Sequence, residues 1–206
     1  MAKILDLIRR LRISYELRKG AFYLRLARSS GRVEANRTVV CRGAPMLDIR
    51  AGTTLTIGSR TQLNSLNLGY HVNMANPVKL MADRQGASIS IGSDSRIHGS
   101  CIHAQERITV GDRVLIAAGC QIMDGSGHDT SFESPDRRIT TKGSTKPVII
   151  EDDVWLGAGV IVLPGAHIGR GTIVSAGSVV RGVIPSRSLV SGNPCVVVRS
   201  HHSRGD

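Results

Sequence analysis

The sequence predicts an all-β fold in which short strands stack into a parallel β-helix. An aliphatic residue recurs at every sixth position from Ile150 to Val180, and a small or β-branched residue stands four places after each of the first five. Neither a 3.6-residue nor a two-residue period explains this pattern. A third register holds residue types that tolerate the left-handed conformation of a tight corner, namely Asp153, Gly159, Gly165, Gly171 and Gly177. Six residues therefore form one side and one corner of a coil, and the aliphatic residues of successive coils stack on one another.

A basic arm over residues 1–42 precedes the coil. It holds eleven Lys and Arg against three acidic residues, and so carries most of the net charge of +11. Ile4, Ile8, Leu11 and Tyr15 fall at helical spacing. Such a short basic helix either lies on an anionic membrane, or packs on the coil end or on a neighbouring subunit. No nucleic-acid-binding motif accompanies the charge, so we expect no nucleic-acid partner.

We expect the β-helix domain over residues 43–199, followed by a C-terminal tail over 200–206. The six-residue phase is irregular within residues 64–86, where no register can be assigned, and is clear again from Ile91. Residues 123–147 interrupt it a second time with Gly, Ser, Thr, Asp and Pro. This composition predicts a loop that protrudes from the coil.

The coil resembles the left-handed β-helix (hexapeptide-repeat) acyltransferases over roughly Ile91 to Arg199. The motifs that carry the resemblance are Gly111-Asp-Arg-Val-Leu-Ile-Ala, Asp124-Gly-Ser-Gly-His128, Val154-Trp-Leu-Gly-Ala-Gly, Ser175-Ala-Gly-Ser-Val-Val and Gly192-Asn-Pro-Cys-Val-Val-Val-Arg199. Their order and spacing look most like the galactoside and maltose acetyltransferases and the O-acetyltransferases of bacterial surface polysaccharides. The resemblance implies a left-handed coil, a homotrimer, and acetyl transfer from acetyl-CoA to a sugar hydroxyl without a metal.

His128 is the candidate general base. Transfer from a thioester to a hydroxyl needs a base for the hydroxyl proton, and imidazole suits that task near neutral pH. In the resembling family a histidine at the matching point of this loop is the base, which implies the role for His128. Asp124 or Asp129 could hold the second ring nitrogen, and we assign Asp124 to the catalytic group. Relatives often place a further acidic residue where this chain has Ser126, so the orienting partner stays open.

The donor site is expected on the later coils. The pantetheine arm of coenzyme A needs small residues that expose the backbone, and its phosphates need cations. The resemblance implies phosphate contacts from two arginines, with Arg170 or Arg187 as further candidates. The complete set of predicted coenzyme A contacts is Trp155, Gly157, Ala158, Ala176, Gly177, Arg181 and Arg199.

Acceptor contacts are assigned to Trp155, His103 and Gln105. The resemblance places such a tryptophan beside the acetyl group or the sugar. His103 and Gln105 lie near the position where sugar acetyltransferases tend to hold an acidic contact, so a galactoside or maltose substrate is not assumed. We expect a carbohydrate acceptor in the biosynthesis of a bacterial surface polysaccharide, such as O-antigen, capsule or exopolysaccharide.

Three other functions stay open on the sequence. N-acetylation of an amino sugar or an antibiotic would use the same histidine, because a neutral amine needs less help from a base. A γ-carbonic-anhydrase-like zinc enzyme has the same fold, and His98 and His103 are five apart. The third is a non-catalytic scaffold. Four cysteines without CxxC spacing and an N-terminus without a signal-peptide core predict a cytoplasmic protein, with the basic arm placing it at the inner face of the membrane.

Overall fold

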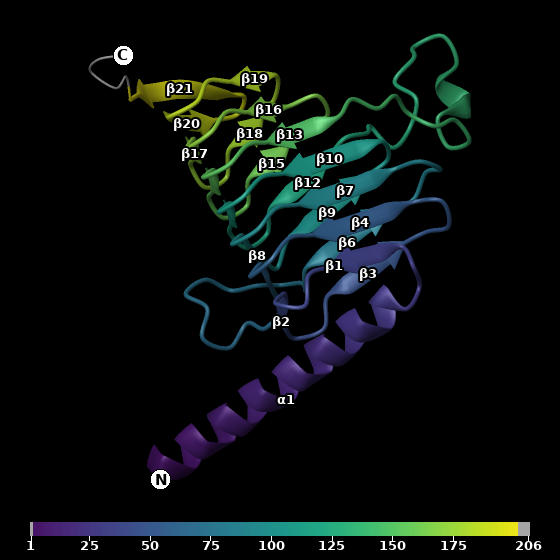
Figure 1. Cartoon of the computed structure of the whole chain (residues 1–206). Coiled ribbons are helices and arrows are strands. Elements are labelled where there is room, and N and C mark those ends of the chain that lie inside the picture. The colour runs from purple at the N-terminus through teal and green to yellow at the C-terminus, as the bar shows by residue number, and fades with distance from the viewer. Residues whose placement is uncertain (1, 202–206) are drawn as a thin grey trace.

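The structure, a computed structural model, describes residues 2–201 and shows a three-sided parallel β-helix preceded by one long helix (Figure 1). Three sheets of seven, eight and six strands form the faces of a prism, which we call sheets A, B and C. Each coil contributes one strand to each sheet in turn, and the connections form corners AB, BC and CA. The strand pairs are parallel, except for the antiparallel pair of β20 and β21 that ends the coil.

The strands share short lengths and a common stacking direction along the prism. Sheet A contains β1 (Val33–Ala35), β4 (Thr54–Ile57), β7 (Ser88–Ile91), β10 (Arg107–Val110), β13 (Val148–Ile150), β16 (His167–Ile168) and β19 (Val183–Ile184). Sheet B contains β2 (Val40–Arg42), β5 (Gln62–Asn64), β8 (Arg96–His98), β11 (Leu115–Ile116), β14 (Trp155–Leu156), β17 (Ile173–Val174), β20 (Ser188–Gly192) and β21 (Cys195–Ser200). Sheet C contains β3 (Met46–Ile49), β6 (Lys79–Ala82), β9 (Cys101–Ala104), β12 (Gln121–Met123), β15 (Ile161–Val162) and β18 (Val179–Val180).

The core is the aliphatic ladder that the six-residue period predicts. The six residues of the first register are each 0% exposed, namely Ile150, Leu156, Val162, Ile168, Val174 and Val180. The corner register also has positive φ throughout, from Asp153 at 62° to Gly177 at 70°. Because a left-handed residue turns the chain sharply, each six-residue unit ends in a corner and the next strand lies on a new face. The prediction of a parallel β-helix is therefore confirmed.

The coil begins at Val33, ahead of residue 43 where the sequence placed the start of the domain. The irregular segment contains a regular strand, because β6 pairs with β3 and β9. Its irregularity comes from residues 65–78, which form a loop at corner BC before the coil resumes. A second loop, residues 124–147 with the 3₁₀ turn Pro135–Arg137, protrudes from corner CA (Figure 1). Of the predicted tail, residues 202–206 lie outside the described residues.

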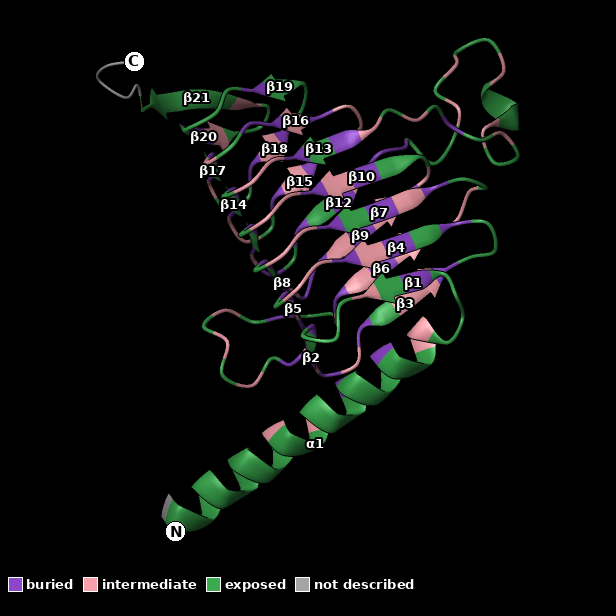
Figure 2. Ribbon diagram, in the orientation of Figure 1, coloured by how far each residue is buried: buried purple, intermediate pink, exposed green. Residues whose placement is uncertain are grey.

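Helix α1 (Ala2–Arg28) occupies most of the basic arm that the sequence predicts over residues 1–42, and β1 and β2 of the coil take up part of the remainder. Its C-terminal half packs on the first coil, where Leu24 is buried and Gly20 allows close approach. A Cβ at Gly20 would lie 2.7 Å from the carbonyl oxygen of Gly43. Most of the helix is exposed (Figure 2). Among residues 2–201, no helix has the length and apolar character needed to span a bilayer.

Candidate functional site

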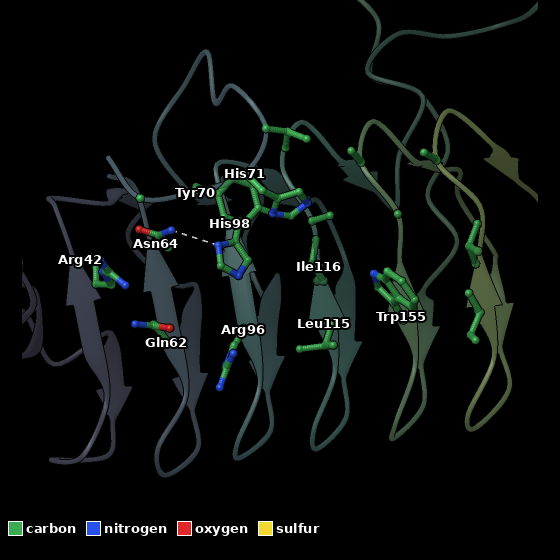
Figure 3. A pocket seen from close by; sticks show the side chains of 18 of the residues that line it. Arg42, Gln62, Asn64, Tyr70, His71, Arg96, His98, Leu115, Ile116 and Trp155 are labelled. Atoms are coloured by element: carbon green, nitrogen blue, oxygen red, sulfur yellow. Dashed lines mark hydrogen bonds between the residues drawn. The ribbon is translucent and has the colours of Figure 1, made fainter. Parts of the chain in front are cut away.

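A groove of about 800 Å³ runs along the outer face of sheet B (Figure 3). Its floor is a row of outward side chains on neighbouring strands, Leu115, Trp155 and Ile173, which pair in register. Residues 68–72 of the 65–78 loop form one wall, and small residues of corner BC form another. The groove is therefore apolar along its middle and bordered by exposed backbone.

Four predicted donor contacts line this groove: Trp155, Gly157, Ala158 and Ala176. The backbone N–H groups of Ala158 and Ala176 donate to no other described residue, so they are free to bind the carbonyl groups of a ligand. Gly157 also allows close packing of neighbouring coils, because a Cβ there would lie 2.6 Å from the nitrogen of Ala176. The missing side chain at Gly157 lets two coils stack closely.

The other three predicted donor contacts are dispersed. Arg199 lines a second cavity of about 500 Å³ with Arg187 and His201, and this cavity shares Ile173 with the groove. Gly177, at φ 70°, forms the corner next to Ala176. Arg181 lies between β18 and β19 at corner CA, away from sheet B. The structure therefore places Arg187, one of the further candidates, beside Arg199 in the second cavity, and separates Arg181 from both within one chain.

Arg170, the other arginine considered for the phosphates, is engaged elsewhere. Its guanidinium lies 3.0 Å from the carboxylate of Asp152, and its backbone N–H donates to Glu151. The other carboxylate oxygen of Glu151, Oε1, lies 2.7 Å from Nε2 of His167. This charge cluster at corner AB gives Arg170 a partner within the chain.

A cluster around His98 in the groove was not predicted from the sequence. The ring of Tyr70 stacks on that of His98 with centroids 4.4 Å apart, and Asn64 Nδ2 lies 3.0 Å from His98 Nδ1 (Figure 3). Burial, followed by the charges of Arg96 and Arg42, lowers the pKa of His98 to about 4. A neutral ring that accepts from Asn64 at Nδ1 carries its proton on Nε2.

The six-residue repeat could have predicted only part of this cluster. Asn64 and His98 occupy paired positions on neighbouring strands of the ladder. Tyr70 belongs to the segment whose register the six-residue period does not assign. His98 and His103, considered as zinc ligands, lie on sheets B and C respectively. Among residues 2–201, no group of three or more His, Cys, Asp or Glu is placed to hold a metal.

His128 lies exposed in the 124–147 loop with one ring nitrogen fixed. Its Nδ1 is 2.7 Å from the carbonyl oxygen of Arg138. A carbonyl oxygen can only accept, so Nδ1 carries the proton and Nε2 keeps its lone pair. Arg138 is held in turn by a hydrogen bond from its guanidinium to the carbonyl of Ser131, at 3.0 Å. The loop therefore presents His128 in the tautomer that a general base needs.

Asp124 does not orient His128, which corrects its assignment as a catalytic partner. It is fully buried, and its carboxylate accepts hydrogen bonds from the backbone N–H groups of residues 105, 106 and 107 at 2.6–2.8 Å. The alternative partner, Asp129, accepts from the N–H of Ser131. Asp124 instead fixes the root of the loop to the preceding coil, because three charge-assisted hydrogen bonds hold this corner.

The predicted acceptor contacts His103 and Gln105 lie at the root of the same loop. His103 is on β9 beside Met123 of β12, and its Nε2 is 3.1 Å from Asp83 Oδ1. Gln105 lies against Gly125, with its side-chain oxygen buried and unpartnered among the described residues. Asp83 supplies an acidic group next to His103 that the sequence did not single out.

The two halves of the predicted site lie at different edges of the prism. His128, His103 and Gln105 are at corner CA, whereas Trp155, Ala158 and Ala176 line sheet B and corner BC. A rigid coil separates these edges, so one chain does not bring His128 to the groove.

Residues 147–182 match the protein family described as bacterial transferase hexapeptide (six repeats). Galactoside O-acetyltransferase of Lactococcus lactis is 42% identical over 105 residues, 49% of this chain and 51% of that protein. Probable acetyltransferase Rv3034c of Mycobacterium tuberculosis is 32% identical over 171 residues, 81% of this chain and 53% of that protein. The chain thus spans about half the length of these two relatives.

The match covers a larger share of a third relative than of these two. The putative lipopolysaccharide biosynthesis O-acetyl transferase WbbJ of Escherichia coli is 33% identical over 149 residues, 68% of this chain and 74% of that protein. Among solved structures, a point mutant of AntD, an N-acyltransferase from Bacillus cereus in complex with dTDP-4-amino-4,6-dideoxyglucose and coenzyme A, has a TM-score of 0.65. Its sequence is 18% identical, and the match covers 86% of this chain and 88% of that chain. At this identity the likeness shows the fold.

Proposed function

Because the chain belongs to the bacterial hexapeptide-repeat transferase family, with its left-handed β-helix, we propose that it transfers an acetyl group from acetyl-CoA to a carbohydrate hydroxyl. The groove on sheet B is the observation that carries this proposal. It combines an apolar floor, free N–H groups at Ala158 and Ala176, and cationic side chains at one end. These features suit the apolar, amide and phosphate parts of coenzyme A respectively.

His128 acts as the general base in this proposal. The hydrogen bond from Nδ1 to Arg138 leaves Nε2 unprotonated, so Nε2 removes the proton of the acceptor hydroxyl as its oxygen attacks the thioester carbonyl. Coenzyme A leaves as the thiolate, and His128 returns the proton to it. No metal is needed for this step.

The active site is completed between chains of a homotrimer. His128 and the groove lie at different edges of one chain, and a closed threefold assembly brings such edges of neighbouring chains together. In this arrangement the groove of one chain binds the donor, and the CA corner of its neighbour supplies the base, Arg181 and acceptor contacts.

A surface-polysaccharide precursor is the preferred acceptor, and α1 places the enzyme at the membrane that holds it. The face of α1 directed away from the coil carries an exposed apolar stripe, Ile4, Ile8, Leu11, Tyr15, Phe22 and Leu26. Eight basic and two acidic residues accompany the stripe on this helix. Apolar side chains flanked by basic ones bind the interface of an anionic leaflet.

Acetylation of an amine is the second candidate, because AntD is an N-acyltransferase. Incubation with acetyl-CoA and a panel of sugars, amino sugars and aminoglycosides, followed by mass spectrometry, tests both. We expect a product heavier by one acetyl group that mild hydroxide removes, because esters hydrolyse and amides persist. A hydroxide-stable product would establish N-acetylation, and coenzyme A release without any acetylated product would contradict transfer.

Ala176→Trp tests the donor groove, because Ala176 is exposed and lines it. The indole fills the path proposed for pantetheine, so the KM for acetyl-CoA should rise at least tenfold. Ala21→Trp, at an exposed position on α1 outside the groove, is the matched control. Equal effects of the two substitutions would contradict the assignment of the groove.

A further inference from the structure

The end of the groove farthest from Arg199 carries positive charge without a partner. Arg42 on β2 lies at this end, and Arg96 on β8 lines the groove two ladder steps nearer its middle. The Nε atom of Arg42 is buried and has no hydrogen-bond partner in the part of the chain that the structure describes. Arg96 likewise forms no ion pair with another residue within 2–201. None of the described residues that line the groove is acidic. An unpaired buried donor is costly, so this end suits an anionic ligand.

The neighbouring side chains offer further donors. His98 accepts from Asn64 at Nδ1, and its Nε2–H faces the groove without a partner among the described residues (Figure 3). Arg96 is two residues before His98 on β8, and Arg42 is two ladder steps from His98 through Asn64. The oxygen of Asn64 accepts from the N–H of Leu66 and so is occupied. This end of the groove therefore presents mainly donors and positive charge, which matches phosphate oxygens.

Cationic side chains lie toward both ends of the groove. Five ladder steps separate β17 from β2 along sheet B, or about 24 Å at the usual strand spacing. Arg187 and Arg199 lie beyond one end, Arg42 marks the other end, and Arg96 lies two ladder steps inside it. Coenzyme A with its phosphates at the first end would direct the acetyl group toward the middle. The second end is then free for an anionic group on the acceptor.

We propose, on the basis of the function given above, that the acceptor is a sugar attached through a diphosphate, and that Arg42 and Arg96 bind this diphosphate. The linkage fixes the sugar with one hydroxyl toward Trp155 and the acetyl group. Sugar nucleotides and lipid-diphosphate sugars share this chemistry. Neutral free sugars lack it and should be poor acceptors.

Calorimetry with inorganic pyrophosphate tests the proposal on protein saturated with coenzyme A, which occupies the donor end. Saturable binding is expected. Arg42→Gln and Arg96→Gln should each weaken it at least tenfold, the effect expected on losing a charged hydrogen bond. Arg42→Lys keeps the charge and should lose less. Arg37→Gln, at an exposed position outside the groove, is the control and should bind as the wild type does.

Three outcomes would overturn the inference. They are failure of pyrophosphate to bind the coenzyme A complex, an equal loss of binding in Arg37→Gln, and dependence of binding on Arg187 and Arg199 instead. Failure of coenzyme A itself to bind would reject the proposed function rather than this inference alone. Uridine diphosphate and farnesyl diphosphate then distinguish the sources: tighter binding of the first indicates a nucleotide-linked sugar, and tighter binding of the second a lipid-linked sugar.

Discussion

The tautomer of His128 is set by a backbone carbonyl rather than by a carboxylate. Its Nδ1 donates to the carbonyl of Arg138, which fixes the ring through the loop conformation. No carboxylate is needed to leave Nε2 unprotonated. The chemistry of the site therefore depends on a single side chain and on the loop that holds it.

His128→Ala should remove catalysis and spare donor binding. The loss of a positioned general base costs ~10²–10⁴ in rate, whereas the groove residues Ala158 and Ala176 lie at another corner. Steady-state turnover should fall by that factor while acetyl-CoA affinity, measured by calorimetry, stays within a few-fold. Retention of more than about a tenth of the turnover would show that another group, with His103 the next candidate, is the base.

Asp124→Asn should destabilise the fold. The carboxylate accepts three buried backbone hydrogen bonds, and an amide keeps one acceptor oxygen and adds a donor that faces other donors. A cost of ~1–3 kcal/mol is expected from chemical denaturation. The pH–rate profile of the folded variant should keep the wild-type shape. A shifted profile with unchanged stability would instead restore Asp124 to a catalytic role.

His98 should make stability depend on pH below neutrality. Its folded pKa is about 4, against 6.5 for the free side chain, owing first to burial and then to Arg96, Arg42 and His71. Between these values the unfolded chain binds the extra proton, so this contribution is complete above about pH 6.5 and is lost as pH falls toward 4. The Tm of wild type should fall more steeply from pH 7 to pH 5 than that of His98→Gln. Parallel curves would contradict this.

At the scale of elements, α1 has one face that packs on the coil and another that stays exposed. Its C-terminal half covers the open end of the coil through Gly20 and Leu24, and the apolar stripe runs along the opposite face of the whole helix. Removal of the whole helix would expose the coil core. Substitutions on the stripe are therefore the cleaner way to separate membrane binding from folding.

Ile8→Glu with Leu11→Glu should abolish binding to phosphatidylglycerol vesicles, because both apolar contact and positive charge are reduced. Ser14→Glu with Ala21→Glu changes the charge equally at other exposed positions of α1. Cosedimentation should fall at least tenfold for the first pair and only a few-fold for the second. Acetyl transfer in solution should stay unchanged in both. An equal loss of vesicle binding in the two double variants would show that binding depends on charge alone and not on the apolar stripe.

The coil was predictable because its periodic signal arises from burial repeated in every turn. The periodic pattern did not predict the corner residues of the earlier coils. Arg60, Asp94 and Arg113 occupy such corners and also have positive φ. Left-handed backbone costs such residues roughly 1–2 kcal/mol, more than an exposed ion pair returns. The Arg60–Asp94 and Arg113–Asp153 pairs across these corners therefore offset only part of the strain. The tight corner requires the conformation, and glycine is one of several residues that accept it.

The site was less predictable than the coil. Local spacing indicated Trp155, Ala158 and Ala176, which share a groove, but it could not show that Asp124 points toward residues 105–107. Tyr70 and Asp83 enter through non-periodic segments, where sequence spacing does not determine which residues meet. Long-range hydrogen bonds and loop packing, rather than the repeat, decide these contacts.

At the scale of the whole molecule, the separation of His128 from the groove is the feature that most constrains the mechanism. The two lie at corner CA and on sheet B of a rigid prism. A monomer would leave both halves of the site incomplete. We therefore expect a homotrimer in solution with three active sites, each built from two chains.

Mixing two impaired variants tests this claim most directly. His128→Ala keeps the groove, and Ala176→Trp keeps the base, so at an acetyl-CoA concentration well below the wild-type KM each homotrimer should have at most about a tenth of the wild-type activity. Co-expressed in equal amounts, they should form mixed trimers in which about a quarter of the sites combine an intact groove with an intact His128 from the neighbouring chain. Acetyl transfer should then return to roughly that fraction of the wild-type rate. A mixture as inactive as its two components, with mixed trimers verified by mass spectrometry, would contradict a site shared between chains.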